Sequence, residues 1–251
     1  MVWKIRSNRN VAGVYQEILG LEKLEDLIVS YDRACIQRPP ERKMPDKMWL
    51  HLDQDFHTKG LRCIQGFVTL EDCEEKDGTL IVVPGSHKFH NEFFEAFPER
   101  KETKGNWVKF SETEVNWWTN KGLAPIRVAA PKGSLVLWDS RSVHCNCYAQ
   151  SDRENKDRFR YAIYVCYARR QDSTPKLLKR KREVFEAHRT TSHWPLANFK
   201  QFPEKPQWCQ NQQEEPPTSL KVRTREDLKK ISRGYRAAHI LPLIPCVLVI
   251  S

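Results

Sequence analysis

The sequence of 251 residues lacks an apolar run long enough to cross a membrane. A spanning helix needs about 20 consecutive, mainly apolar residues. The apolar end of the chain, residues 240–250, is short and is interrupted by Pro242 and Pro245. The N-terminus, residues 1–6, has no apolar core of the kind that a secretory signal carries. We therefore expect a protein without a membrane span that acts in the cytoplasm.

The sequence also lacks a paired cysteine motif. Cys145 and Cys147 form one C-x-C pair, but no second pair completes the two knuckles of a structural zinc site. The other six of the eight cysteines are scattered along the chain. In a reducing compartment such cysteines stay as thiols and behave as small buried hydrophobic side chains. The pattern therefore disfavours a zinc finger.

Positive charge is in excess, because 42 Lys and Arg against 32 Asp and Glu give a formal net charge of +10. The densest basic block is residues 176–182. Clustered Lys and Arg side chains can contact nucleic-acid phosphates, but no recognised binding motif accompanies them here. The block also fits a helix that packs through Leu177, Leu178, Val184 and Phe185. A basic nucleic-acid-binding protein is therefore the disfavoured alternative, and it stays open.

The middle of the chain, about residues 49–170, consists of short strand-like segments separated by turn signals. The strand candidates are residues 27–32, 48–53, 60–70, 79–83, 134–138 and 159–167. This pattern is typical of a sandwich or barrel, and a jelly roll is one solution that can hold a metal in its mouth. We expect a single domain, with N-terminal support in residues 1–48 and a basic extension in residues 171–251. Helices are predicted in that extension at residues 176–189 and 224–238.

One strand end carries candidate metal ligands. His51 and Asp53 lie two residues apart and so project from one face of the strand, while Leu50 and Leu52 project from the other. His144 follows a second strand candidate. Two histidines and one carboxylate form the facial triad of non-haem Fe(II) oxygenases, which leaves coordination positions open. Each residue alone also fits a structural role, such as a hydrogen-bonded histidine or a turn-capping carboxylate.

An Fe(II) oxygenase of this type needs a co-substrate that supplies electrons. If that co-substrate is 2-oxoglutarate, its distal carboxylate needs a cation, and arginine can donate two parallel hydrogen bonds to a carboxylate. Arg160 opens the clearest strand after His144 and is the candidate. Arg158 lies on the same face by the two-residue period and is the alternative. Either arginine also fits an exposed strand end.

In the order of these features the chain resembles the phytanoyl-CoA dioxygenase-like family of Fe(II)/2-oxoglutarate-dependent oxygenases. The resemblance covers roughly residues 49–170, and its Pro-Gly-Ser-His block is quite specific for the family. The matching segments are His51-Leu52-Asp53-Gln54, residues 78–88, residues 132–139 with His144, and residues 159–163, with a fainter echo in residues 189–195.

The resemblance implies a mainly β fold, a double-stranded β-helix or jelly roll with flanking helices. It implies iron bound by His51, Asp53 and His144, and 2-oxoglutarate bound by Arg160, with Asn146 touching the co-substrate. The implied reaction consumes O2, releases succinate and CO2, and hydroxylates a small organic substrate. Asp53 favours hydroxylation, because related halogenases lack this carboxylate. A catalytically inactive jelly-roll protein that binds metal without turnover is the other alternative.

Residues 88–122 form a long insertion rich in Phe and Trp. Long insertions in compact domains are often lids or binding loops, and this one is expected to set substrate specificity. Our first expectation for its aromatic side chains is that they pack the insertion onto the core. His57 and His90 have no partner in the pattern and are expected at the surface.

Overall fold

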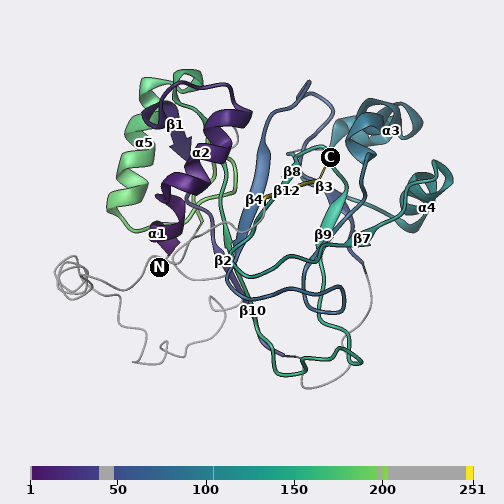
Figure 1. The fold of residues 1–251 in the computed structure, drawn as a ribbon. Helices are drawn as coiled ribbons and strands as arrows, with labels where there is room; N and C mark the ends of the chain where they lie inside the picture. Colours follow the sequence, from purple (N-terminus) through teal and green to yellow (C-terminus); the bar gives the residue numbers. More distant parts are fainter. Residues whose placement is uncertain (1, 40–47, 104, 197–198, 203–246, 251) are drawn as a thin grey trace, which may run out of the picture.

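Two five-stranded sheets form the centre of the molecule (Figure 1). The computed structural model describes residues 2–39, 48–103, 105–196, 199–202 and 247–250. The first sheet has the order β12 (Val247–Ile250), β8 (Leu135–Asp139), β4 (Ile64–Thr69), β10 (Arg160–Tyr164) and β2 (Ala34–Gln37). The second has the order β6 (Val108–Lys109), β3 (His51–Leu52), β9 (His144–Asn146), β5 (Leu80–Val82) and β7 (Ile126–Arg127). A separate pair joins β1 (Leu27–Val29) to β11 (Tyr167–Arg169).

Strand alternation divides the apolar side chains between two faces of the first sheet. Leu135 and Leu137 of β8 pack against the N-terminal helices, whereas Val136 and Trp138 pack toward the second sheet. Leu80 of β5 meets them from that second sheet. The strands pair antiparallel apart from β12, which runs parallel to β8. This arrangement of facing sheets with flanking helices confirms the predicted mainly β jelly roll.

Helices cover the outer face of the first sheet (Figure 1). They are α1 (Val2–Arg6) and α2 (Arg9–Ile18), and α5 (Pro175–Glu186) packs beside them against α1 and β1. Short 3-10 helices lie at Leu24–Asp26 and Arg170–Asp172. The Tyr15 hydroxyl of α2 donates a hydrogen bond of 2.7 Å to the Val165 carbonyl. A Cβ at Gly66 would lie 2.5 Å from the Tyr15 hydroxyl oxygen and 2.6 Å from a Leu137 methyl carbon. Glycine at this position therefore lets α2 approach the sheet.

The insertion covers the outer face of the second sheet. It contains α3 (His90–Ala96) and α4 (Glu112–Asn120), with 3-10 helices at Ser86–Phe89 and Pro98–Glu102. Ser111 and Glu114 form a capping box that begins α4. Phe93, Phe94 and Trp118 are buried in a cluster that includes strand residues of the second sheet. This confirms that most of the insertion's aromatic side chains pack it onto the core.

The structure refines several sequence-based boundaries. The segment predicted as one strand over 159–167 is divided, because β10 pairs within the first sheet and β11 pairs with β1. Strands β2 and β12 belong to the first sheet although they lie outside residues 49–170. The predicted helix at 176–189 is present as α5, and the one at 224–238 lies outside the described residues. Within the described residues, none of the helices combines the length and apolar character that a membrane crossing requires.

Candidate metal centre

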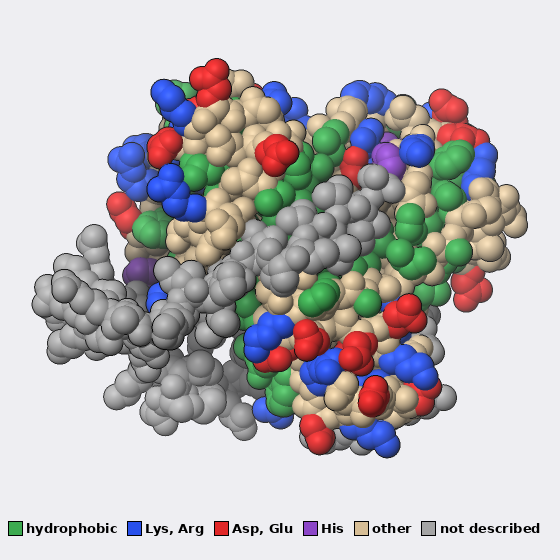
Figure 2. All heavy atoms as spheres, viewed as in Figure 1, with side chains coloured by type: hydrophobic (Ala, Val, Ile, Leu, Met, Phe, Trp, Pro, Cys, Tyr) green, Lys and Arg blue, Asp and Glu red, His purple; other side chains and the backbone are tan. Residues whose placement is uncertain are grey.

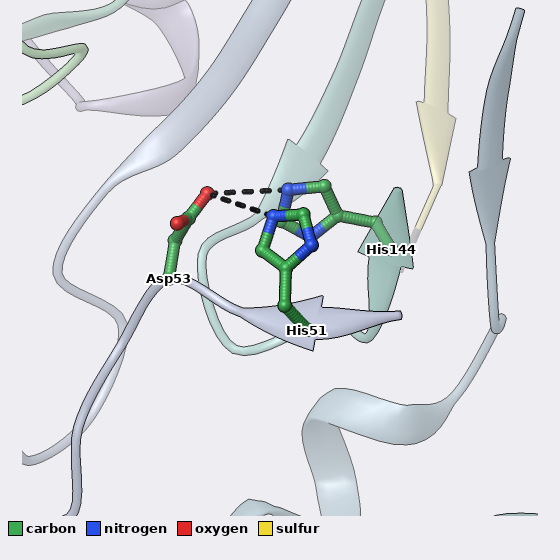
Figure 3. Close-up of side chains that lie close together, drawn as sticks. All are labelled: His51, Asp53 and His144. Atoms are coloured by element: carbon green, nitrogen blue, oxygen red, sulfur yellow. Dashed lines mark ion pairs between the residues drawn. The ribbon is translucent and has the colours of Figure 1, made fainter. Parts of the chain in front are cut away.

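Three predicted ligands meet on the inner face of the second sheet (Figure 3). His51 of β3 lies directly opposite His144 of β9 in an antiparallel pairing, and Asp53 follows the end of β3. Leu52 packs on the outer face with the insertion, so the alternation sends His51 and Asp53 inward. Residues distant in the sequence thus converge because two short strands pair in this register.

The potential ligand atoms of His51, Asp53 and His144 all lie within 4.8 Å of one another. Asp53 Oδ2 is 3.2 Å from His144 Nε2 and 3.8 Å from His51 Nε2, as the dashed lines in Figure 3 mark. The three residues retain only 4–8% of their accessible surface. A carboxylate and two imidazoles at this spacing form a donor set suited to one divalent cation.

Hydrogen bonds orient all three groups. His51 Nδ1 lies 3.2 Å from the Trp49 carbonyl oxygen, and His144 Nδ1 lies 2.9 Å from the Ser142 carbonyl oxygen. A carbonyl only accepts, so each Nδ1 carries the hydrogen and each Nε2 presents a lone pair toward Asp53. Gln65 Nε2 donates to Asp53 Oδ2 over 2.8 Å. Three acceptor atoms then converge with no donor between them, an arrangement that a cation stabilises.

The ionisation of the cluster is consistent with ligation. Burial and the neighbouring His144 lower the pKa of His51 to about 4, so its imidazole is neutral at pH 7. Burial alone would raise the pKa of Asp53, but the positive charge that His193, His144 and His51 carry when protonated holds that pKa well below its usual range. Metal ligands must be deprotonated, and at pH 7 these two groups are.

Aromatic rings enclose the histidines. The Trp49 ring stacks on His51 at 4.6 Å between centroids and 10° between planes. Trp138 of β8 lies 5.3 Å from the His144 ring. Trp107, which precedes β6 in the insertion, lies 5.9 Å from the His51 ring and keeps 52% of its surface exposed. The Trp138 ring therefore lies against His144, and the exposed Trp107 ring lies beside His51.

Arg160 and Asn146 lie together. Arg160 Nη1 donates a hydrogen bond of 2.8 Å to Asn146 Oδ1, and the Tyr164 hydroxyl lies 3.3 Å from the same oxygen. Asn146 and His144 lie two residues apart on β9 and share a face, roughly 7 Å along the strand. Arg160 is buried, its guanidinium lies 5.4 Å from the centre of the Phe67 ring, and its Nη2 has no partner among the described residues. Burying such a cation without a counter-charge is costly, so an anion placed beside Nη2 would stabilise it.

Arg158 is engaged elsewhere. Its Nη1 lies 2.9 Å from Asp77 Oδ2 and 3.4 Å from Glu74 Oε1. Arg153 donates to the other oxygen of Asp77 over 2.8 Å. These pairs hold the 150–158 loop against the turn that precedes β5. Of the two predicted arginines, Arg160 is therefore the one with a buried donor that has no described partner.

Sequence reasoning missed several groups around the cluster. Gln65 and Tyr164 belong to predicted strands, but only the sheet register indicates that they reach Asp53 and Asn146. His193 affects Asp53 electrostatically, and its buried Nε2 has no described partner; the fainter family echo was its only signal.

The expectation for His90 was wrong. It is buried, with its Nε2 3.0 Å from the Gln54 carbonyl oxygen. It opens a helix that packs on the second sheet, and its ring lies 5.1 Å from that of Phe94. The sequence pattern did not reveal this partner because the hydrogen bond joins positions 36 residues apart.

Comparison with known families identifies the class of protein to which this jelly roll with a buried His-Asp-His cluster belongs. The family model described as phytanoyl-CoA dioxygenase (PhyH) matches residues 7–146, more than half of the chain. The chain therefore belongs to the phytanoyl-CoA dioxygenase (PhyH) family.

The chain is also similar to two curated proteins. The chain is 31% identical over 200 residues to Ava biosynthesis cluster protein O of Aspergillus versicolor, covering 77% of this chain and 62% of that protein. It is 28% identical over 174 residues to a putative phytanoyl-CoA dioxygenase of Dictyostelium discoideum, covering 55% of this chain and 47% of that protein. The matches thus span about half to three-fifths of these relatives.

Solved structures show more distant likeness. The epimerase SnoN, in complex with Fe3+, alpha ketoglutarate and nogalamycin RO, has a TM-score of 0.44 and 17% identity, covering 66% of this chain and 58% of that one. EctD from S. alaskensis with 2-oxoglutarate and 5-hydroxyectoine has a TM-score of 0.44 and 17% identity, covering 68% of this chain and 53% of that one.

Proposed function

We propose that this chain is an Fe(II)/2-oxoglutarate-dependent dioxygenase that hydroxylates a small organic substrate and releases succinate and CO2. The observation that carries the proposal is a buried pair of complementary features. Three acceptor groups converge at one point on the second sheet, and the Arg160 guanidinium of the first sheet reaches Asn146 beside them with one buried donor that has no described partner. Membership of the PhyH family supports it independently.

His51, Asp53 and His144 would hold the iron. Their donor set fits Fe(II), because two neutral imidazoles and one carboxylate leave further coordination positions for a co-substrate and O2. When bound, iron and 2-oxoglutarate supply the oxidising chemistry, which uses O2. The carboxylate of Asp53 fills the position that a halide would need, so the site favours hydroxylation over halogenation. Gln65 keeps that carboxylate oriented through its hydrogen bond.

Arg160 would bind the distal carboxylate of 2-oxoglutarate. Its Nη1 is fixed by Asn146, which leaves Nη2 to donate to an incoming anion. The burial of Arg160 beside Phe67 strengthens a charge-assisted hydrogen bond, because the local dielectric is lower than in water. The commitment of Arg158 to Asp77 supports Arg160 over that alternative.

The substrate would approach past Trp49 and Trp107. Both rings contact His51 and remain partly exposed, so they offer apolar surface beside the reacting centre. Trp107 belongs to the insertion, which supports a role for this segment in substrate choice. On the face drawn in Figure 2, Lys and Arg side chains lie interspersed with Asp and Glu, which favours a small-molecule partner over nucleic acid.

A spectroscopic and a turnover measurement test the proposal. Anaerobic addition of 2-oxoglutarate to the Fe(II)-loaded protein is expected to produce a visible charge-transfer band, and admission of O2 is expected to yield succinate. Asp53→Ala is expected to abolish both. Asp55→Asn is the matched control, because Asp55 follows the same strand but is not part of the cluster. An unchanged band in Asp53→Ala would contradict the proposal.

Two broader statements belong with it. We propose that residues 1–251 act as one domain, which is supported by packing of α1, α2 and β11 onto the same sheet. We also propose a cytoplasmic location, supported by the buried free thiols of Cys63, Cys145 and Cys166. Limited proteolysis tests whether the chain acts as one domain, and fluorescence microscopy of a tagged full chain tests its location.

A further inference from the structure

A cavity lies in the helical layer, away from the metal centre. It has a volume of about 510 Å³ and is bordered by α1, α2, β1 and α5. Small-molecule sites commonly measure about 300–1,000 Å³. The cavity shares no lining residue with the His-Asp-His cluster. The helices that border it lie on the outer face of the first sheet, while the cluster lies on the second sheet (Figure 1).

The cavity is lined by positive charge from four separate elements. The cationic lining residues are Arg6 of α1, Arg9 of α2, Arg170, and Lys181 and Arg182 of α5. None of the lining residues is Asp or Glu. Within the part of the chain that the structure describes, no carboxylate forms an ion pair with any of these five cations. Asp32 acts electrostatically on Arg6 from outside the lining, but none of the other four cations has a described carboxylate within ion-pair distance.

Lys181 is the most unusual of the five. Only 2% of its surface is exposed, and its Nζ donates to the Val29 carbonyl at 2.8 Å and the Pro195 carbonyl at 3.0 Å. The ammonium lies 4.2 Å from the centre of the Tyr31 ring. Burial lowers the pKa of Lys181 to about 7. Burying an ammonium without a carboxylate is costly, and an anion bound in the cavity would offset that cost.

The rest of the lining is largely apolar. On α5, Leu178, Lys181, Arg182 and Phe185 follow the i, i+3, i+4, i+7 spacing and therefore share one helix face. Leu24, Leu27, Ile28 and Tyr167 also line the cavity. A ligand that fits this lining needs both a charged head and an apolar body.

We propose that this cavity binds a small amphiphilic anion, a molecule with a phosphate monoester or carboxylate head on a short apolar body. The head lies among the arginine side chains and Lys181, and the body lies against Leu178 and Phe185. The basic block at residues 176–182 thereby gains a role that the oxygenase reaction does not give it. The proposal is independent of the metal centre.

Isothermal titration calorimetry with octyl phosphate tests the proposal on the full chain. We expect saturable binding at one site per chain. Octanol and inorganic phosphate, which each supply half of the ligand, are expected to bind at least about tenfold more weakly, because each forfeits one set of contacts. The double variant Arg9→Gln/Arg182→Gln is expected to weaken octyl phosphate binding by at least about tenfold, as the loss of charge-assisted hydrogen bonds predicts.

The matched control is Lys176→Gln/Lys179→Gln, which removes the same charge from α5 at exposed positions outside the cavity. It is expected to bind octyl phosphate as the unaltered protein does, and so is Asp53→Ala. Equal weakening in both double variants would overturn the proposal by indicating general surface attraction. Loss of binding in Asp53→Ala would place the ligand at the metal centre and overturn it as well.

Two further outcomes also count against it. One is absence of saturable octyl phosphate binding. The other is co-sedimentation with phosphatidylcholine vesicles containing phosphatidic acid when octyl phosphate does not bind, because the anion recognised would then be a membrane surface.

Discussion

Substitution of Arg160 by glutamine offers the sharpest test of the co-substrate site. The Arg160 Nη2 group is buried and has no described partner, so its hydrogens are free to be donated to a ligand. Two charge-assisted hydrogen bonds to a carboxylate are together worth about 3–6 kcal/mol. Their loss would raise the dissociation constant for 2-oxoglutarate by roughly 10²–10⁴-fold. Iron affinity should change little, because Arg160 is not among the clustered ligands.

The assay is an anaerobic titration of the Fe(II)-loaded protein with 2-oxoglutarate, followed by its visible absorption. Arg158→Gln is the matched control, because it removes the same charge two residues away. Since Arg158 pairs with Asp77, this control should keep its affinity for 2-oxoglutarate and lose stability instead. The reasoning is refuted if Arg158→Gln weakens co-substrate binding as much as Arg160→Gln, or if Arg160→Gln weakens iron and 2-oxoglutarate equally.

Two stability predictions follow. Asp77→Asn should lower the free energy of unfolding by about 3–5 kcal/mol, because buried Arg153 loses its carboxylate; a loss below about 1 kcal/mol in urea unfolding would contradict this. Lys181 has a folded-state pKa of about 7 against an ordinary 10.5. Between these two pH values the unfolded chain binds a proton that the folded chain does not, so the free energy of unfolding rises with pH. Between pH 7 and 9 the free energy of unfolding should rise by roughly 2 kcal/mol more in the unaltered protein than in Lys181→Met. An equal change with pH in both proteins would refute the lowered pKa of Lys181.

The sequence was most informative where the pattern is local. The two-residue period placed His51 and Asp53 on one face, opposite Leu52, and this alternation is what the structure has. The short strands separated by turn signals fitted a jelly roll, the resemblance carried by the Pro-Gly-Ser-His block implied one, and the observed sheets agree. These features depend on side-chain period and turn chemistry, which neighbouring residues determine.

Long-range features could not be predicted in the same way. The choice between Arg158 and Arg160 depends on Asp77, which lies 81 residues before Arg158 in the chain. The division of the strand at 159–167 depends on whether its partners are β4 or β1. The cavity beside Lys181 forms only because α1, α2 and α5 pack together. In each case the determining partner is distant in sequence, and no local periodicity reports it.

The same limit explains the error at His90. The hydrogen-bond partner of His90 lies 36 residues away, so nothing local indicated its burial, yet packing of α3 against the second sheet covers it. Conversely, the aromatic side chains of the insertion carried a compositional signal, and most of them are buried in the core or packed against it, as expected.

The central claim is that His51, Asp53 and His144 bind one iron atom. An anaerobic crystal structure of the Fe(II)-loaded protein, with data collected on either side of the iron absorption edge, measures this directly. A single anomalous peak within bonding distance of both Nε2 atoms and the Asp53 carboxylate is the predicted result. A peak at any other place in the chain, with no metal bound to these three side chains, would contradict it.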